Sequence, residues 1–235
     1  RQALGTDHPQ VGHHLHNLAV ALQAQGKLEE AAPLYEESMR VLQRVLGERH
    51  PQTLDAAANY GRFLHRRGEL ARAEEMLGKV VELDRQARGP RHAFVGHDLV
   101  NLGMVRLDMQ QHAQAEQDFR AALDIYAEAL PADHPYVVSA LSGLGRSQLE
   151  QNRLAEAEQT LRRAKQIAAK SVPADSPQLA AANSSLGRVL MAQRRSEEAA
   201  QLLRESYPIL VQAQGENAVI TQRTRDALAQ LSAKR

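Results

Sequence analysis

The chain has 235 residues, of which 43% are hydrophobic, 24% are charged and only 3% are aromatic, and it contains no tryptophan. This balance excludes a disordered chain and argues against one large core. Alanine, leucine, glutamine, glutamate and arginine are abundant, and these residues favour helices. Lysine and arginine number 29 against 28 aspartates and glutamates, and a net charge of +1 lacks the basic excess of a dedicated nucleic-acid binder.

A turn motif recurs every 42 residues along the chain. It places histidine or serine before proline in four copies and before alanine in one, at His8-Pro9, His50-Pro51, His92-Ala93, His134-Pro135 and Ser176-Pro177. Proline suits the first position of a helix, because the amide that it lacks would be unpaired there. Each motif therefore predicts the start of a first helix of roughly 15 residues.

The predicted first helices end at one position per repeat, which is occupied by Gly26, Gly68, Gln110, Asn152 and Arg194. Glycine and asparagine tolerate the left-handed conformation that closes a helix, whereas glutamine and arginine adopt it less readily. A second helix of roughly 17 residues should follow and end at glycine or proline, at Gly47, Gly89, Pro131, Pro173 or Gly215. Pro208 lies inside the last of these helices, where its missing amide predicts a kink or an early end.

Small residues mark the same place in every predicted hairpin. The first helices carry Ala19, Gly61, Gly103, Gly145 and Gly187, and the second helices carry Ala31, Ala73, Ala115, Ala157 and Ala199. Small side chains let two helices approach closely. Larger residues should then fill the gap between one hairpin and the next, at Tyr35, Leu77, Phe119, Leu161 and Leu203. Stacking of the hairpins would supply a shared core.

This repeat resembles the tetratricopeptide repeat in its 42-residue form, which is typical of kinesin light chains and of many bacterial relatives. The stretch HHLHNLAVALQAQGKLEEAAPLYEESMRVLQRVLGERHP carries the resemblance most fully. It implies an all-α fold, a right-handed α-α superhelix of about five hairpins. A single array over residues 1–235 would comprise the tail of a preceding repeat, five repeats and a capping helix, at 1–5, about 8–46, 50–88, 92–130, 134–172, 176–214 and 217–234.

The resemblance also implies a ligand surface, because the first helices of tetratricopeptide arrays line a concave groove. The position before the large apolar residue of each first helix is asparagine in three repeats, at Asn17, Asn59 and Asn101. In the family an asparagine at this place grips the backbone of a bound peptide, since one amide offers both a donor and an acceptor. The alternative is that these amides only bridge adjacent helices.

Arginine recurs on the same expected surface, at Arg62, Arg146 and Arg188, with His65 and Arg66 nearby. Spaced guanidinium groups suit carboxylates and suggest an acidic ligand segment or a chain terminus. The alternative is internal pairing, because the same helices carry Asp55, Asp108 and Glu150. Apolar pockets for ligand side chains would come from Leu107, Leu149 and Met191.

His13 and His16 are the one metal-like feature, because a spacing of three places them on one helical face. No carboxylate or cysteine at metal spacing joins them, so we expect groove histidines and no cofactor. Nothing resembles a phosphate-binding loop, a nucleophile elbow or a zinc protease helix. The sequence therefore predicts a chain without catalytic activity of its own.

Together these features predict a protein–protein interaction module that binds a peptide or protein segment, with no nucleic-acid or membrane partner. Two alternatives stay open: a sensor or docking region of a larger bacterial serine/threonine protein kinase or regulator, and a scaffold that self-associates through its open N-terminal end. The absence of cysteine and of any membrane-spanning apolar run favours the cytoplasm.

Overall fold

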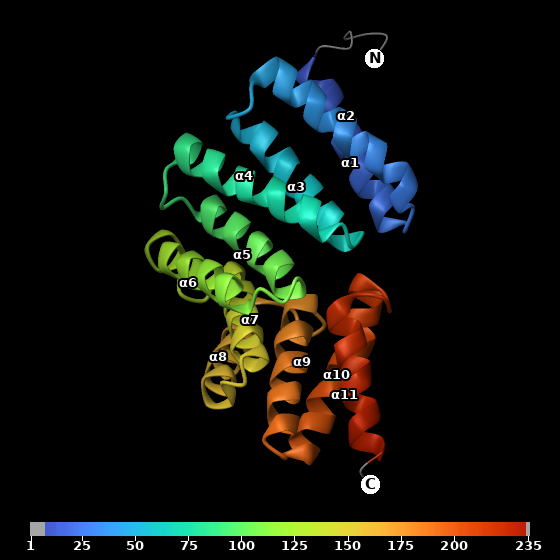
Figure 1. Ribbon diagram of the computed structural model, residues 1–235, viewed down its shortest axis with the longest axis vertical. Helices are drawn as coiled ribbons and strands as arrows, with labels where there is room; N and C mark the ends of the chain where they lie inside the picture. Colours follow the sequence, from blue (N-terminus) through green and yellow to red (C-terminus); the bar gives the residue numbers. More distant parts are fainter. Residues whose placement is uncertain (1–7, 234–235) are drawn as a thin grey trace. The chain divides into compact units, whose positions relative to one another are not determined.

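The computed structural model describes residues 8–233, which form eleven helices and no strand. The helices follow one another in hairpin pairs, and the predicted all-α fold is confirmed (Figure 1). Their bounds are α1 Pro9–Ala24, α2 Leu28–Leu46, α3 Pro51–Arg66, α4 Leu70–Arg88, α5 Ala93–Asp108, α6 His112–Ala129, α7 Pro135–Glu150, α8 Leu154–Ser171, α9 Pro177–Ala192, α10 Ser196–Gln214 and α11 Val219–Ala233. The predicted tail of a preceding repeat, at residues 1–5, lies outside the described residues.

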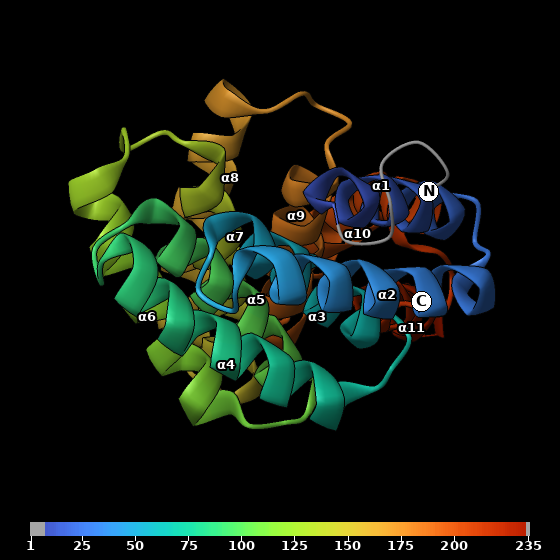
Figure 2. The same cartoon turned by 90° about the horizontal axis from the view of Figure 1, so that it is seen from above.

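Two compact units divide the chain, one ending at Val105 and the other beginning at Arg106, so that the boundary falls within α5. In the first unit, α1 packs on α2, α2 on α3 and α3 on α4. In the second, contacts join each helix from α6 to α11 to the next one, and the first helices α7, α9 and α11 also touch in order. Figure 2, seen from above, shows α1 and α2 side by side.

The histidine of each turn motif caps the helix that follows it. The imidazole Nδ1 atoms of four such residues accept hydrogen bonds from the backbone amide two residues further on, at 3.2–3.3 Å, in His8, His50, His92 and His134. Ser176 does the same with its hydroxyl, which accepts from the Leu179 amide at 3.2 Å. These side chains satisfy amides that the first turn of a helix leaves unpaired.

All five residues at the ends of the first helices adopt the left-handed conformation. Gly26 and Gly68 have φ of 77° and 81°, and Gln110, Asn152 and Arg194 have φ of 62°, 59° and 65°. The geometry of the turn is thus kept where the sequence lacks glycine. Pro208, by contrast, neither ends nor shortens α10, which continues to Gln214.

In several hairpins a leucine of the second helix fills the space above a glycine of the first helix. A Cβ atom added at Gly61 would lie 2.7 Å from Leu77 Cγ, and one at Gly187 would lie 2.8 Å from Leu203 Cγ. The same pairing joins Gly145 to Leu161. Between hairpins, Phe119 of α6 fills the space above Gly143 of α7, and the Tyr35 ring of α2 lies 4.7 Å from that of Phe63 of α3. The expectation that large second-helix residues lie between hairpins is confirmed for these two, and Leu77, Leu161 and Leu203 also approach a glycine of their own hairpin.

The pair Gly61 and Gly78 tests this packing, because both glycines belong to the hairpin of α3 and α4. Gly61→Ala should lower the free energy of unfolding by about 1–3 kcal/mol, since the added methyl group collides with the branch of Leu77. Gly78→Ala should raise it by about 0.5–1 kcal/mol, since a Cβ there meets nothing within 4 Å and stiffens the unfolded chain. Urea unfolding of both variants measures the difference, and equal effects would contradict the close approach.

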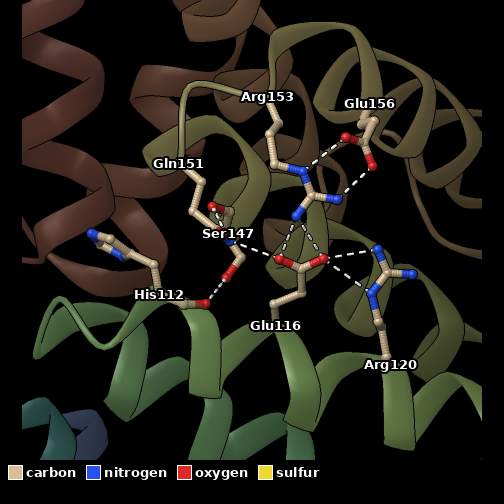
Figure 3. A network of polar contacts seen from close by, with 7 residues as sticks. All are labelled: His112, Glu116, Arg120, Ser147, Gln151, Arg153 and Glu156. Carbon is tan, nitrogen blue, oxygen red and sulfur yellow. Dashed lines mark hydrogen bonds and ion pairs between the residues drawn. The ribbon is translucent and has the colours of Figure 1, made fainter.

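A network of charged side chains holds the turn between α7 and α8 against α6 (Figure 3). The Glu116 carboxylate accepts hydrogen bonds from Arg120, Gln151 and Arg153, with Arg153 Nη1 at 2.7 Å from Oε2. Arg153 also pairs with Glu156 in the first turn of α8. Because Glu116 is buried, each of these donors offsets the cost of removing its charge from water.

The same network recurs one period later around Glu158. Arg195 Nη1 lies 2.6 Å from Glu158 Oε1, and Arg195 also pairs with Glu198. Burial alone would raise the pKa of Glu158, but hydrogen bonds from Arg162, Gln193 and Arg195 outweigh it and lower the pKa to about 2. The charged networks therefore repeat with the hairpins.

Candidate functional site

In the first unit, polar contacts join the neighbouring first helices α1 and α3. Asn59 Nδ2 hydrogen-bonds His16 Nε2 at 3.3 Å, and Asn59 Oδ1 accepts from Arg62 Nη1 at 3.2 Å. His13 Nε2 likewise hydrogen-bonds Gln52 Oε1 at 3.1 Å. Both ends of the Asn59 amide are therefore already engaged, as the helix-bridging alternative predicts.

The other two asparagines of the series lie in different surroundings. Asn101 is half-buried and hydrogen-bonds His97 Nδ1 on its own helix at 3.3 Å, whereas Asn17 is exposed. Burial lowers the pKa of His97 to about 4, with the nearby Arg62 adding to the effect and Asp55 opposing it, so the ring is neutral at pH 7. Asn17 is thus the one of the three asparagines whose side chain is exposed.

The basic residues of α3 face solvent to different degrees. Arg62 and Arg66 are exposed and His65 is half-buried. Asp55, which we considered as a partner for this group, pairs with Arg88 of α4 instead, at 2.5 Å. The two arginines thus have exposed side chains on the same first helix, α3.

In the second unit, the arginines of the first helices pair with acidic residues of the preceding repeat. Arg146 Nη2 lies 3.3 Å from Asp108 Oδ1 and is largely buried, and Arg188 Nη2 lies 3.0 Å from Glu150 Oε1. In each pair the two residues are 38 apart, four fewer than the period. The structure therefore shows the internal pairing that we held as the alternative for these two arginines.

Arg223 of α11 joins this group, with Nη1 2.9 Å from the same Oε1 atom of Glu150. Sequence reasoning missed it, because the sequence predicted only a capping helix over residues 217–234. Its position, 35 residues after Arg188, does not match the arginine series, so the period alone could not find it.

The charges of the group do not cancel. Arg188 and Arg223 share the single carboxylate of Glu150, so these three side chains together carry one net positive charge. Burial would raise the pKa of Glu150, but Arg188, Arg223 and Arg146 outweigh it and hold the pKa below its ordinary value. Glu150 is thus ionised at neutral pH.

The apolar residues expected to line pockets pack into the core to differing extents. Leu107 has no exposed surface, and we leave it out of the proposed ligand surface. Leu149 and Met191 are half-buried against the cluster formed by residues such as Leu161 and Leu186. Only their partly exposed surface is open to a ligand.

Within residues 8–233, no three histidine, cysteine or acidic side chains come together in a way that could hold a metal ion. His13 and His16 contact Gln52 and Asn59, as described above. None of the described helices is long and apolar enough to span a membrane.

A cluster of three aspartates around one arginine lies inside the first unit. Arg88 pairs with Asp84 at 2.9 Å and with Asp55, and Asp98 is only 5% exposed. Burial, helped by the charges of Asp84 and Asp55 and opposed by Arg88, raises the pKa of Asp98 from its ordinary 3.8 to about 8. Asp98 thus keeps its proton at neutral pH. Alanine holds this place in other repeats, at Ala56, Ala140 and Ala182.

Asp98→Asn tests the buried proton. Because the folded-state pKa is raised, the unfolded chain releases this proton near pH 4 and the folded chain near pH 8, so wild-type stability falls as pH rises through this window. The variant should gain stability relative to wild type between pH 5 and pH 8.5, on the order of a few kcal/mol. Chemical denaturation across this range measures it, with Asp124→Asn as an exposed control; a pH-independent difference would contradict the assignment.

Hairpins that recur with a 42-residue period, with polar and charged side chains linking successive first helices, define a helical-repeat protein. A sequence profile described as tetratricopeptide repeat matches residues 1–42, 10–86 and 98–170. The chain belongs to the tetratricopeptide repeat family, whose members generally mediate protein–protein interactions and are generally non-catalytic.

Solved structures share this fold. One is a kinesin light chain candidate from Podosopora anserina with nearly identical TPR-like repeats, at a TM-score of 0.68 and 24% identity over 88% of this chain and 99% of that chain. Another is BtubC (BKLC) from P. vanneervenii, with a TM-score of 0.69 and 19% identity over 88% of this chain and 84% of that chain. A thermophilic TPR protein of Thermus thermophilus matches with a TM-score of 0.62 and 19% identity over 93% of this chain and 99% of that chain. No curated protein matches the sequence.

Proposed function

We propose that this chain is a protein–protein interaction module whose first helices bind an acidic segment of a partner protein. The observation that carries the proposal is the excess of guanidinium groups over carboxylates around Glu150 in the second unit. Arginine pairs with carboxylates through two parallel hydrogen bonds, which gives both affinity and orientation. Two arginines that share one carboxylate therefore favour an anionic ligand over a neutral one.

The first unit supports the same ligand chemistry with different residues. Arg62 and Arg66 are exposed on α3, and Asn17 is exposed on α1. The arginines would attract acidic side chains, while the amide would hold the ligand backbone. Partly exposed Leu149 and Met191 in the second unit would contact apolar side chains of the ligand.

The triple substitution Arg62→Ala, Arg188→Ala and Arg223→Ala tests this proposal. An array of twelve-residue peptides that differ only in carrying glutamate, glutamine or lysine gives the ligand preference. Wild type should retain the glutamate peptides selectively, and the triple variant should lose about tenfold in affinity for them, because each removed guanidinium forfeits a charge-assisted pair.

A matched control removes the same charge elsewhere. Arg40, Arg85 and Arg204 are exposed on the second helices α2, α4 and α10. Their replacement by alanine should leave binding nearly unchanged. Equal loss in the control would show that overall charge alone attracts the peptides, and undiminished binding by the first variant would reject the proposed surface.

A second candidate function, self-association, is favoured by an exposed apolar position on α1. Leu18 is 51% exposed, whereas its equivalent Tyr60 is 2% exposed. Tyr60 is covered by the preceding second helix: its ring stacks on Tyr35 at 6.0 Å and its hydroxyl donates to Glu36 at 2.6 Å. In the part of the chain that the structure describes, no helix precedes α1 to cover Leu18 in this way.

A second copy of the chain could cover this face of α1. Sedimentation should then show a concentration-dependent dimer for wild type, and Leu18→Glu should shift it to monomer, because a charge cannot be buried there without a partner. Leu22, partly buried on the same helix, is left unchanged to preserve the fold. A wild-type chain that stays monomeric at high concentration would exclude this role.

A further inference from the structure

Two guanidinium groups of the second unit share a single carboxylate oxygen. Arg188 of α9 and Arg223 of α11 approach Glu150 Oε1 of α7 at 3.0 and 2.9 Å. The three side chains are between 19% and 24% exposed, so they are shielded from bulk water and yet accessible. Ion pairs in such places are screened less by salt than pairs on an open surface.

Most of the donor capacity of this pair lies beyond Glu150. A guanidinium group has five N–H donors in a fixed plane, and each of the two arginines uses one of them on the shared oxygen. One carboxylate oxygen cannot satisfy two groups that each suit a pair of oxygens. The arrangement therefore has both the charge and the donors to receive a second carboxylate.

The neighbouring pair does not consume this capacity. Arg146 pairs with Asp108 at 3.3 Å. Arg188, Arg223 and Glu150 are left with one net positive charge, which matches one incoming carboxylate. A doubly charged group would leave the site with an excess of negative charge.

We propose that Arg188 and Arg223 form a site for one ligand carboxylate and that Glu150 sets its strength as a built-in competitor. This deepens the proposed function and rests on it for the identity of the ligand as an acidic peptide. Glu150 holds the two arginines in place when no ligand is bound. It also repels an arriving carboxylate and occupies part of the same donor set, so the site favours ligands that other contacts have already brought near.

Glu150→Gln separates these two effects, because it keeps the shape of the side chain and removes its charge. The probe is an acetylated, amidated peptide of four glutamates, titrated calorimetrically at two salt concentrations. The variant should bind it about tenfold more tightly than wild type does, with a steeper loss at high salt. Adding Arg223→Ala to this variant should abolish the gain, since the second guanidinium group is then missing.

Controls keep the result interpretable. Glu205→Gln, an exposed change on α10 of the same unit, should bind as wild type does. Circular dichroism shows whether each variant is folded, and glutarate compared with chloride at equal ionic strength should raise the thermal midpoint of Glu150→Gln more than that of wild type. This second measurement needs no peptide binding.

The outcomes distinguish the two proposals. If wild type selects acidic peptides but Glu150→Gln gains neither affinity nor stabilisation by glutarate, the competitor role is overturned and the proposed function stands. If glutarate stabilises Glu150→Gln through Arg223 while the peptide array shows no acidic preference, the carboxylate site stands and the peptide-binding function fails. A gain that survives Arg223→Ala places the anion elsewhere and also overturns the inference.

Discussion

The close approach of two helices within each hairpin is the constraint on which the rest of the structure depends. Where Gly61, Gly145 and Gly187 meet leucines of the second helix, no side-chain atom separates the backbone from its partner. This contact allows the two helices of a hairpin to pack at a short separation, and it recurs with the 42-residue period of the chain. Because the hairpins share one shape, their stacking, their helix ends and their charged networks recur from one hairpin to the next.

Charged residues repeat with the hairpins on two sides of the second unit. Glu116 and Glu158 are each held by an arginine 37 residues later, at the start of the next second helix. On the first helices, Asp108 and Glu150 are each held by an arginine 38 residues later. Both spacings are slightly shorter than the period, so each pair joins one hairpin to the next. Because these pairs are partly buried, removal of one partner would cost more stability than the intact pair contributes.

Much of the fold could be predicted from the sequence, because a fixed 42-residue step leaves few choices of secondary structure. The turn motifs gave the helix starts, and even the left-handed residues Gln110 and Arg194 lie where the register placed them. Tyr35 and Phe119 lie between hairpins as expected, but spacing did not reveal that Leu77 and its equivalents also approach a glycine within their own hairpin. The early end considered for the helix at Pro208 does not occur, because a helix supported by packing tolerates the loss of one backbone hydrogen bond.

The candidate site was less predictable than the fold. The sequence suggested both uses of the arginine series, and only coordinates could show Arg146 and Arg188 paired with residues of the preceding repeat. Arg223 lies outside the 42-residue arginine series, and Asp98 stands where other repeats have alanine. From one sequence alone, such a departure cannot be distinguished from ordinary variation between repeats. The surroundings of Arg223 and Asp98, a shared carboxylate and a buried acidic cluster, arise from residues far apart in the chain.

The capping side chains make each first helix independent of the others at its start. The imidazole Nδ1 atoms of His8, His50, His92 and His134 accept from the amide two residues further on, and Ser176 accepts from the amide three residues further on. An alanine in place of one of these residues would leave one amide without its partner and fray one helix. The other four starts would keep their caps.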